Sequence, residues 1–150
     1  MPPSSAGQAG EVDETEARAR TASARVARLA TANPSGTIDL VPVTFALTGD
    51  RLVTAVDHKP KSTTRLRRLD NIRFQPAVTL LVDHYEDNSW DELWWVRLRG
   101  LARVVEDGPD HEAAVAALVR RYEPYVEQPP TGPVIIVEVT EWHGWSARRS

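Results

Sequence analysis

Short turn motifs between strand-like segments constrain the fold of this 150-residue chain most strongly. The segment 25–31 alternates polar and apolar residues, as a half-buried strand does. The motif Asn33-Pro34-Ser35-Gly36 indicates a turn after it, and Gly49-Asp50 separates the next two strands. Turns this short join antiparallel neighbours, because parallel strands need a long crossover connection. The chain is therefore predicted to form a mostly antiparallel sheet.

About six strands are expected, with a few helices between them. The predicted strands are 25–31, 38–47, 51–57, 77–85, 93–105 and 134–139, and the predicted helices are 16–23, 62–72 and one that begins at Pro109. Pro42 within the second strand indicates an edge, a bulge or a gap in the ladder that faces a ligand. The fifth strand is expected to bend at Gly100. A sheet of this kind in so short a chain favours a closed or split β-barrel with helices at its ends.

The composition predicts one domain with an N-terminal tail. Residues 1–14 are rich in Pro, Ser, Gly and Ala and then acidic, so we predict that this tail is disordered and that 15–150 form the domain. The chain has no cysteine, which excludes a disulfide framework, a thiolate zinc site and a cysteine nucleophile. No secretory signal or membrane-length apolar run is visible, so we expect a cytoplasmic protein without a membrane partner.

The two lysines of the chain, Lys59 and Lys61, lie together where a strand is predicted to turn into a helix. Free backbone N–H groups at such a turn, with two ammonium groups beside them, suit a phosphate or another polyanionic ligand. A solvated basic turn is the alternative. Residues 58–73 carry six basic residues and one acidic residue, a local charge of +5 in a chain whose net charge is -3. This patch fits a small anionic ligand better than a nucleic acid, although a charged helix face would also explain it.

The sequence contains none of the common catalytic motifs: no zinc-ligand spacing, no Gly-x-Ser-x-Gly, no Rossmann fingerprint and no P-loop. We therefore predict no metal site and assign no catalytic residue. The chain does contain five tryptophans, of which Trp94 and Trp95 must face opposite sides of their strand. Core and dimer packing would explain them, and so would stacking on a planar ligand. A planar ligand with an anionic tail accounts for both the tryptophans and the basic turn, which indicates a flavin-like cofactor that carries the chemistry itself.

Several motifs resemble those of the pyridoxamine 5'-phosphate oxidase-like (PPOX class) split β-barrel flavoproteins, and among them the F420-dependent oxidoreductases found chiefly in actinobacteria. The resemblance extends from about residue 25 to residue 145. The motifs that carry it are Arg25-Val-Ala-Arg-Leu-Ala-Thr, Asn33-Pro-Ser-Gly, Leu40-Val-Pro-Val-Thr-Phe, Val53-Thr-Ala-Val-Asp-His-Lys-Pro-Lys, Leu69-Asp-Asn-Ile-Arg-Phe-Gln-Pro, Val82-Asp-His-Tyr and Leu93-Trp-Trp-Val-Arg. The resemblance implies a mainly β (α+β) fold, a six-stranded antiparallel split β-barrel of the FMN-binding type with flanking helices.

The resemblance also implies a homodimer with two cofactor sites between the protomers. Residues 42–44 would meet the edge of the cofactor ring, and the strand end from residue 54 with the following turn would meet its ribityl and phosphate groups. Arg68 lies near the position where relatives commonly carry a single lysine, which makes it a phosphate-binding candidate beside Lys59, Lys61 and Arg65. The predicted cofactor-binding residues are Pro42, Val43, Thr44, Thr54, Ala55, Val56, Asp57, His58, Lys59, Lys61, Ser62, Thr63, Arg65, Arg68 and Trp145.

The function implied is that of an F420-dependent oxidoreductase, which transfers a hydride between the deazaflavin coenzyme F420 and an unknown small organic substrate. F420 carries a glutamate tail beyond its phosphate, so the +5 patch favours F420 over FMN. An FMN-binding oxidase or reductase of the same fold is one alternative, and a non-catalytic flavin carrier or sensor is another.

Overall fold

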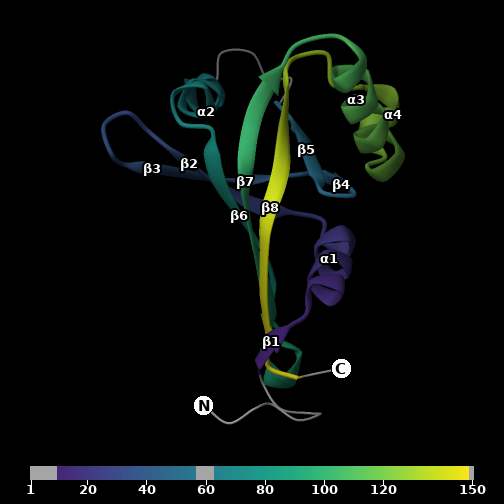
Figure 1. Cartoon of the computed structure of the whole chain (residues 1–150). Coiled ribbons are helices and arrows are strands. Elements are labelled where there is room, and N and C mark those ends of the chain that lie inside the picture. The colour runs from purple at the N-terminus through teal and green to yellow at the C-terminus, as the bar shows by residue number, and fades with distance from the viewer. Residues whose placement is uncertain (1–9, 57–62, 149–150) are drawn as a thin grey trace.

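The computed structural model describes residues 10–56 and 63–148, which form a mainly β fold with flanking helices (Figure 1). The strands are β1 (Gly10–Val12), β2 (Ala27–Ala32), β3 (Ile38–Val43), β4 (Ala46–Thr48), β5 (Arg51–Ala55), β6 (Ala77–His84), β7 (Trp94–Val105) and β8 (Val134–Ser146). The helices are α1 (Glu14–Ser23), α2 (Thr63–Phe74), α3 (Pro109–Arg121) and α4 (Pro124–Glu127), and a single 3₁₀ turn covers Trp90–Glu92. This architecture confirms the predicted fold class.

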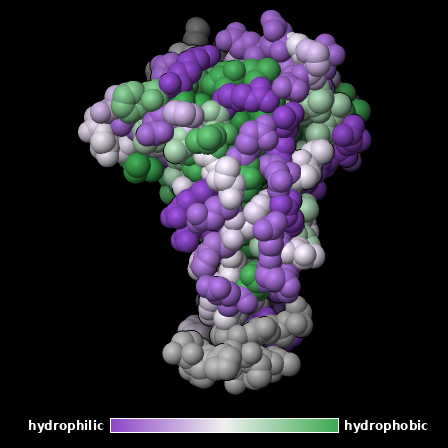
Figure 2. Space-filling view, viewed as in Figure 1, coloured by the Kyte–Doolittle hydropathy of each residue, from purple (hydrophilic) through white to green (hydrophobic). Residues whose placement is uncertain are grey.

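All strands belong to one curled antiparallel sheet with the order β3-β2-β6-β7-β8-β5-β4, and β1 pairs with β8. The two longest strands, β7 and β8, run from the wide upper end of the molecule to its narrow lower end (Figure 1). Helix α2 lies on one side of the upper end and α3 with α4 on the other (Figure 1). The lower parts of β6, β7 and β8, with β1, form a narrow stalk (Figure 2).

The described residues contain eight strands, whereas six were predicted. One additional strand arises because the predicted strand 38–47 is divided: β3 pairs with β2, and after two residues the chain enters β4, which pairs with β5. In the two residues between β3 and β4, the backbone of Phe45 forms hydrogen bonds with side chains instead of with a neighbouring strand. Its N–H donates to the Tyr122 hydroxyl at 3.1 Å, and its carbonyl accepts from Arg121 Nη1 at 3.1 Å.

The other additional strand is β1, which lies in the segment 1–14 that was predicted to be a disordered tail. Residues 10–12 pair with the end of β8, and Asp13 caps α1 by accepting a hydrogen bond from Glu16 N at 2.8 Å. Strand β8 continues to Ser146, beyond its predicted end at residue 139. The ladder between β7 and β8 shifts register between Arg99 and Gly100, at the position where a bend was predicted.

The interior is divided into two apolar clusters. The larger one fills the curl of the sheet and includes Leu29, Phe45, Leu80 and Leu98, none of which is exposed. The smaller one lies under α3 and packs Leu118 and neighbouring residues against β4, β5 and β8. Burial of these side chains supplies the main free energy of folding.

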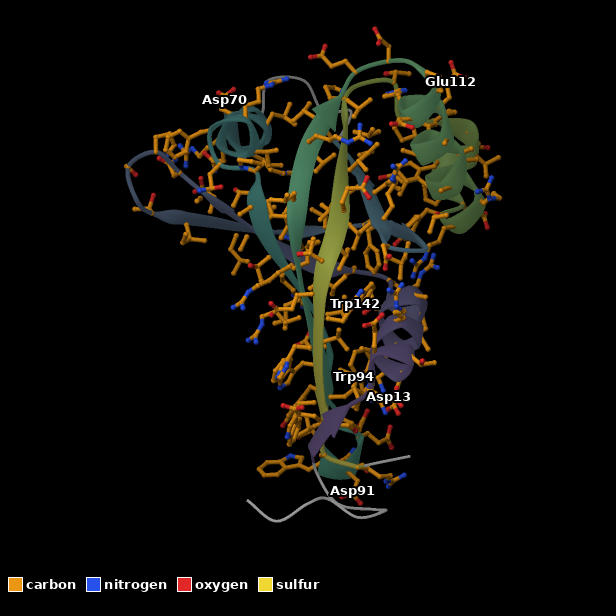
Figure 3. All side chains as sticks on the ribbon, in the orientation of Figure 1. Asp13, Asp70, Asp91, Trp94, Glu112 and Trp142 are labelled. Atoms are coloured by element: carbon orange, nitrogen blue, oxygen red, sulfur yellow. The ribbon has the colours of Figure 1, made fainter. Side chains whose placement is uncertain are left out.

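Helix α1 covers one face of the stalk. The guanidinium of Arg18 lies 4.7 Å from the ring centroid of Trp142, and that of Arg20 lies 5.2 Å from the ring of Trp94. Figure 3 shows both tryptophans on the side of the strands that faces α1. In the residues that the structure describes, no helix combines the length and the apolar character that crossing a membrane requires.

Candidate functional site

A cleft of about 300 Å³ lies at the wide end of the molecule, between the ends of β3 and β5 and the helices α2 and α4. The residues that line it are Pro42, Val43, Thr44, Ala55, Val56, Arg68, Tyr125 and Pro130. The first six of these were predicted to bind a cofactor. The fold thus brings together three separate segments of the predicted site.

Two threonines fix the wall of the cleft where β3 ends. Thr54 is 1% exposed, and its Oγ1 donates to the carbonyl oxygen of Thr44 at 2.6 Å. Thr44 Oγ1 lies 3.0 Å from the hydroxyl of Tyr125, which comes from α4. The structure therefore places Thr54 behind the wall, where it supports Thr44, whereas the side chains of Thr44 and Tyr125 supply hydroxyl groups to the cleft.

Helix α2 presents Arg68 to the cleft because its opposite side is anchored to the sheet. Leu69 and Ile72 are buried, and the buried amide of Asn71 donates from Nδ2 to Thr31 Oγ1 at 3.0 Å and to Asp39 Oδ2 at 2.7 Å. The hydrogen bond from Asn71 lowers the pKa of Asp39 below its usual value of 3.8, and a hydrogen bond from Asn33 and the charge of Arg67 act in the same direction. Asn71 and Asp39 together fix α2 against the β2–β3 hairpin.

The fold reduces the local charge that was counted along the sequence. Arg67 Nη1 lies 3.6 Å from Asp39, and Arg73 Nη2 lies 3.3 Å from Glu106. Both carboxylates lie outside residues 58–73, so each of them offsets a positive charge of the patch. The count along the sequence misses this effect, because these acidic partners are distant in the sequence and close in the structure.

Part of the predicted site lies outside the described residues. This applies to Asp57, His58, Lys59, Lys61 and Ser62, and also to the side chains of Thr63 and Arg65 at the start of α2. Their contacts with a cofactor stay predictions. In the part of the chain that the structure describes, no three His, Asp or Glu side chains come together as a possible metal site.

Trp145 lies apart from the cleft, in a second depression on the stalk. This stalk groove has a volume of about 390 Å³, and its lining includes Leu81, Asp83, Tyr85, Trp95, Arg97 and Trp145. Within a single chain, the predicted contact of Trp145 with the cofactor is therefore separated from the rest of the predicted site.

The sequence model of one protein family, described as pyridoxamine 5'-phosphate oxidase, matches residues 13–146. The chain belongs to the pyridoxamine 5'-phosphate oxidase family. No curated protein matches its sequence significantly.

Solved structures share the fold of this family member. A conserved hypothetical protein of Mycobacterium tuberculosis is 23% identical with a TM-score of 0.72, and the match covers 91% of this chain and 86% of that one. A protein from Mycobacterium smegmatis described as FAD binding is 20% identical with a TM-score of 0.63, over 93% of this chain and 98% of that one. A protein from Mesorhizobium loti described as FAD-binding is 17% identical with a TM-score of 0.64, again over 93% and 98%.

Two residues that line the family member's cleft were missed from the sequence. Tyr125 and Pro130 belong to the Pro-rich segment 123–133, in which no helix or strand was predicted. Pro124 at the start of α4 was a usable signal, because proline is favoured in the first turn of a helix. Nothing local in the sequence shows that α4 lies over the end of β3.

Proposed function

We propose that this member of the pyridoxamine 5'-phosphate oxidase family is an oxidoreductase that binds a flavin-type cofactor in the cleft and uses a small organic substrate. One observation carries the proposal: residues 42–44, 55–56 and 68, selected from the sequence as cofactor contacts, line one cleft. Membership of an oxidase family and structural relatives described as FAD-binding support it.

The chemical character of the cleft fits an aromatic ring with an anionic tail. Pro42, Val43, Ala55 and Val56 supply apolar surface for a ring, and Arg68 supplies a positive charge from the middle of α2. The volume of about 300 Å³ is at the lower end of the range of roughly 300–1,000 Å³ for ligand pockets. One chain therefore offers room for part of a flavin-type cofactor.

The remaining part of the site would come from a second copy of the chain, and we propose a homodimer with two cofactor sites at its interface. The sheet face opposite α1 carries exposed apolar residues, among them Ile38 (62% exposed), Leu40 (65%) and Leu101 (55%). Apolar side chains gathered on one sheet face are typical of an interaction surface.

A bound cofactor would supply the hydride transfer, and the chain's own residues would bind and orient it. Arg68 would hold an anionic group, while the apolar wall at residues 42–43 and 55–56 would position the ring and exclude water. Thr44 and Tyr125 share one hydrogen bond, so the hydroxyl that accepts in it would be free to donate to the polar edge of the ring, with the carbonyl of Thr44 held by the buried hydroxyl of Thr54.

F420 is the cofactor that we propose first, because Lys59, Lys61 and Arg65 are close to Arg68 in the sequence and would add basic groups for its longer anionic tail. The loss of two charges to Asp39 and Glu106 weakens this preference. FMN or FAD is the second candidate, which the FAD-binding descriptions of two structural relatives favour.

Titration of the purified protein with F420, FMN and FAD separately, at low and high salt, tests the proposal. We expect tight binding of one cofactor and a loss of roughly tenfold or more in Arg68→Gln, since a charge-assisted hydrogen bond contributes about 1.5–3 kcal/mol. Arg67→Gln is the matched control, because Arg67 is adjacent but pairs with Asp39 and does not line the cleft. Failure of all three cofactors to bind would refute the proposal, and tighter binding of FMN or FAD than of F420 would select the second candidate.

A further inference from the structure

Two hydroxyl groups in the cleft offer a hydrogen-bond donor that no protein group accepts. Thr44 Oγ1 and the Tyr125 hydroxyl lie 3.0 Å apart and share one hydrogen bond, in which either can donate. The carbonyl oxygen of Thr44 accepts from Thr54 Oγ1 at 2.6 Å. Among the residues that the structure describes, neither Thr44 Oγ1 nor the Tyr125 hydroxyl has a second hydrogen-bond partner. One hydroxyl proton therefore remains for a ligand in the cleft.

The ring of Tyr125 is held in place by Tyr122. The backbone N–H of Tyr125 donates to the Tyr122 carbonyl oxygen at 3.0 Å. The two rings meet edge to face, with their centroids 5.9 Å apart and their planes at 74°, a geometry that aromatic pairs favour. Tyr122 itself is buried. The hydroxyl of Tyr125 is thus directed to the end of β3, next to Thr44.

Tyr125 is the better donor of the two to a ligand that carries negative charge. A phenol is a stronger acid than an aliphatic hydroxyl, and hydrogen bonds to a charged acceptor are the strong ones. In this arrangement Thr44 donates to the Tyr125 oxygen and Tyr125 donates to the ligand. Each hydrogen bond in such a chain polarises the next. Negative charge on the ligand therefore selects Tyr125 as the group that contacts it.

The other residues of the cleft indicate which end of a flavin-type ring lies beside this pair, and this step rests on the proposed function. Apart from Arg68, the remaining described residues that line the cleft are apolar, namely Pro42, Val43, Ala55, Val56 and Pro130. The pyrimidine end of a flavin or deazaflavin ring, with two carbonyl groups, carries more hydrogen-bonding groups than the benzenoid end. Buried polar groups need partners, so the pyrimidine end belongs at Thr44 and Tyr125. Reduction by hydride adds negative charge to that same end, at N1 and the C2 carbonyl oxygen.

We propose that the Thr44–Tyr125 pair makes the cleft bind the reduced cofactor more tightly than the oxidised one. Tyr125 donates to the negative charge at the pyrimidine end, and Thr44 positions Tyr125 by donating to its oxygen. Since binding and reduction are linked equilibria, tighter binding of the reduced form raises the reduction potential of the bound cofactor. The pair thus adjusts the potential of the cofactor as well as its affinity.

Dissociation constants of the oxidised and the chemically reduced cofactor, measured without oxygen, test the proposal. The cofactor used is whichever of F420, FMN and FAD binds the unchanged protein most tightly. We expect the reduced form to bind at least about tenfold more tightly, which corresponds to a potential about 30 mV above that of the free cofactor. Tyr125→Phe should remove most of this preference and Thr44→Val part of it, whereas Thr44→Ser, which keeps the hydroxyl, should retain it.

Arg68→Gln is the matched control, because the anionic group of the cofactor tail that Arg68 would hold has the same charge in both forms. It should weaken binding of both forms by a similar factor and leave their ratio unchanged. Equal or weaker affinity for the reduced form, or an unchanged ratio in Tyr125→Phe, would overturn this proposal and leave the proposed function in place. Failure of all three cofactors to bind the unchanged protein would overturn both.

Discussion

The hydroxyl of Tyr122 binds the backbone of Phe45, which lies between β3 and β4. Its removal in Tyr122→Phe should lower the free energy of unfolding measurably. Tyr122 follows α3 and is 8% exposed. Its hydroxyl accepts from Phe45 N at 3.1 Å and lies 2.9 Å from the carbonyl oxygens of Phe45 and Arg25, to one of which it donates. Phenylalanine keeps the ring but leaves the buried N–H of Phe45 without a partner.

The size of the effect follows from that unpaired group. A buried donor that loses its acceptor costs about 1–3 kcal/mol, while the packing of the ring and its contact with Arg25 are retained. For a chain of this length, each kcal/mol lowers Tm by about 2–4 °C. Tyr122→Phe should therefore lower Tm by roughly 2–12 °C.

Urea unfolding of Tyr122→Phe beside Tyr125→Phe gives the sharpest test. The Tyr125 hydroxyl bonds to Thr44 at the open cleft, where water can replace it, so its loss should cost less than about 1 kcal/mol. Tyr125→Phe should instead change cofactor affinity. If the two variants were equally destabilised, or if Tyr122→Phe unfolded at the urea concentration of the unchanged protein, the role assigned to the Tyr122 hydroxyl would be wrong.

Three further predictions concern the positioning of α2 and the β7–β8 ladder. Asn71→Leu should lower the free energy of unfolding by about 1–3 kcal/mol and weaken cofactor binding, measured by urea unfolding and titration, because Thr31 and Asp39 lose their donor. The depressed pKa of Asp39 means that its contribution is present above pH 3.8 and is lost as the pH falls below it, so Asp39→Asn should flatten the acid limb of a stability–pH profile. Gly100→Ala should cost about 1–3 kcal/mol or more in urea unfolding, because an added Cβ would lie 2.3 Å from the Glu138 carbonyl oxygen.

The parts of the fold that could be predicted from the sequence are those determined by neighbouring residues. The turn at residues 33–36 joins β2 to β3, and Gly49-Asp50 joins β4 to β5. Pro109 begins α3, with acidic residues in the first turn and Arg120 and Arg121 in the last. The irregularity at Gly100 followed from its place inside a long strand. Each of these features is determined by residues within a few positions of it in the sequence.

The parts that could not be predicted depend on contacts between distant segments. The division of 38–47 into β3 and β4 depends on Tyr122, more than seventy residues away, which bonds to the backbone of Phe45. Asp39 and Glu106 neutralise part of the basic patch for the same reason. Tyr125 reaches the cleft because α4 packs beside α3, and no local pattern records this placement.

The distance along β8 between the cleft and Trp145 bears on the proposed dimer. Val134 at the start of β8 pairs with Ala55, which lines the cleft. The strand from Val134 to Trp145 covers about 36 Å at roughly 3.3 Å per residue. A cofactor held by Arg68 therefore lies far from Trp145 of the same chain. If Trp145 contacts the cofactor, as the family resemblance implies, the contact must come from Trp145 of the partner subunit.

Mixed dimers can show whether Trp145 completes the cofactor site of its own chain or that of the partner subunit. Arg68→Gln would damage the cleft of one chain and Trp145→Ala the groove of the other, so each variant alone should bind cofactor weakly. After unfolding and refolding together, half of the dimers should contain one chain of each kind, and each of these would hold one site with both residues intact. Titration should then recover tight binding at about a quarter of all sites, because a two-fold interface repeats the same contact twice. No recovery in a confirmed mixed dimer would show that Trp145 does not complete the site across the interface.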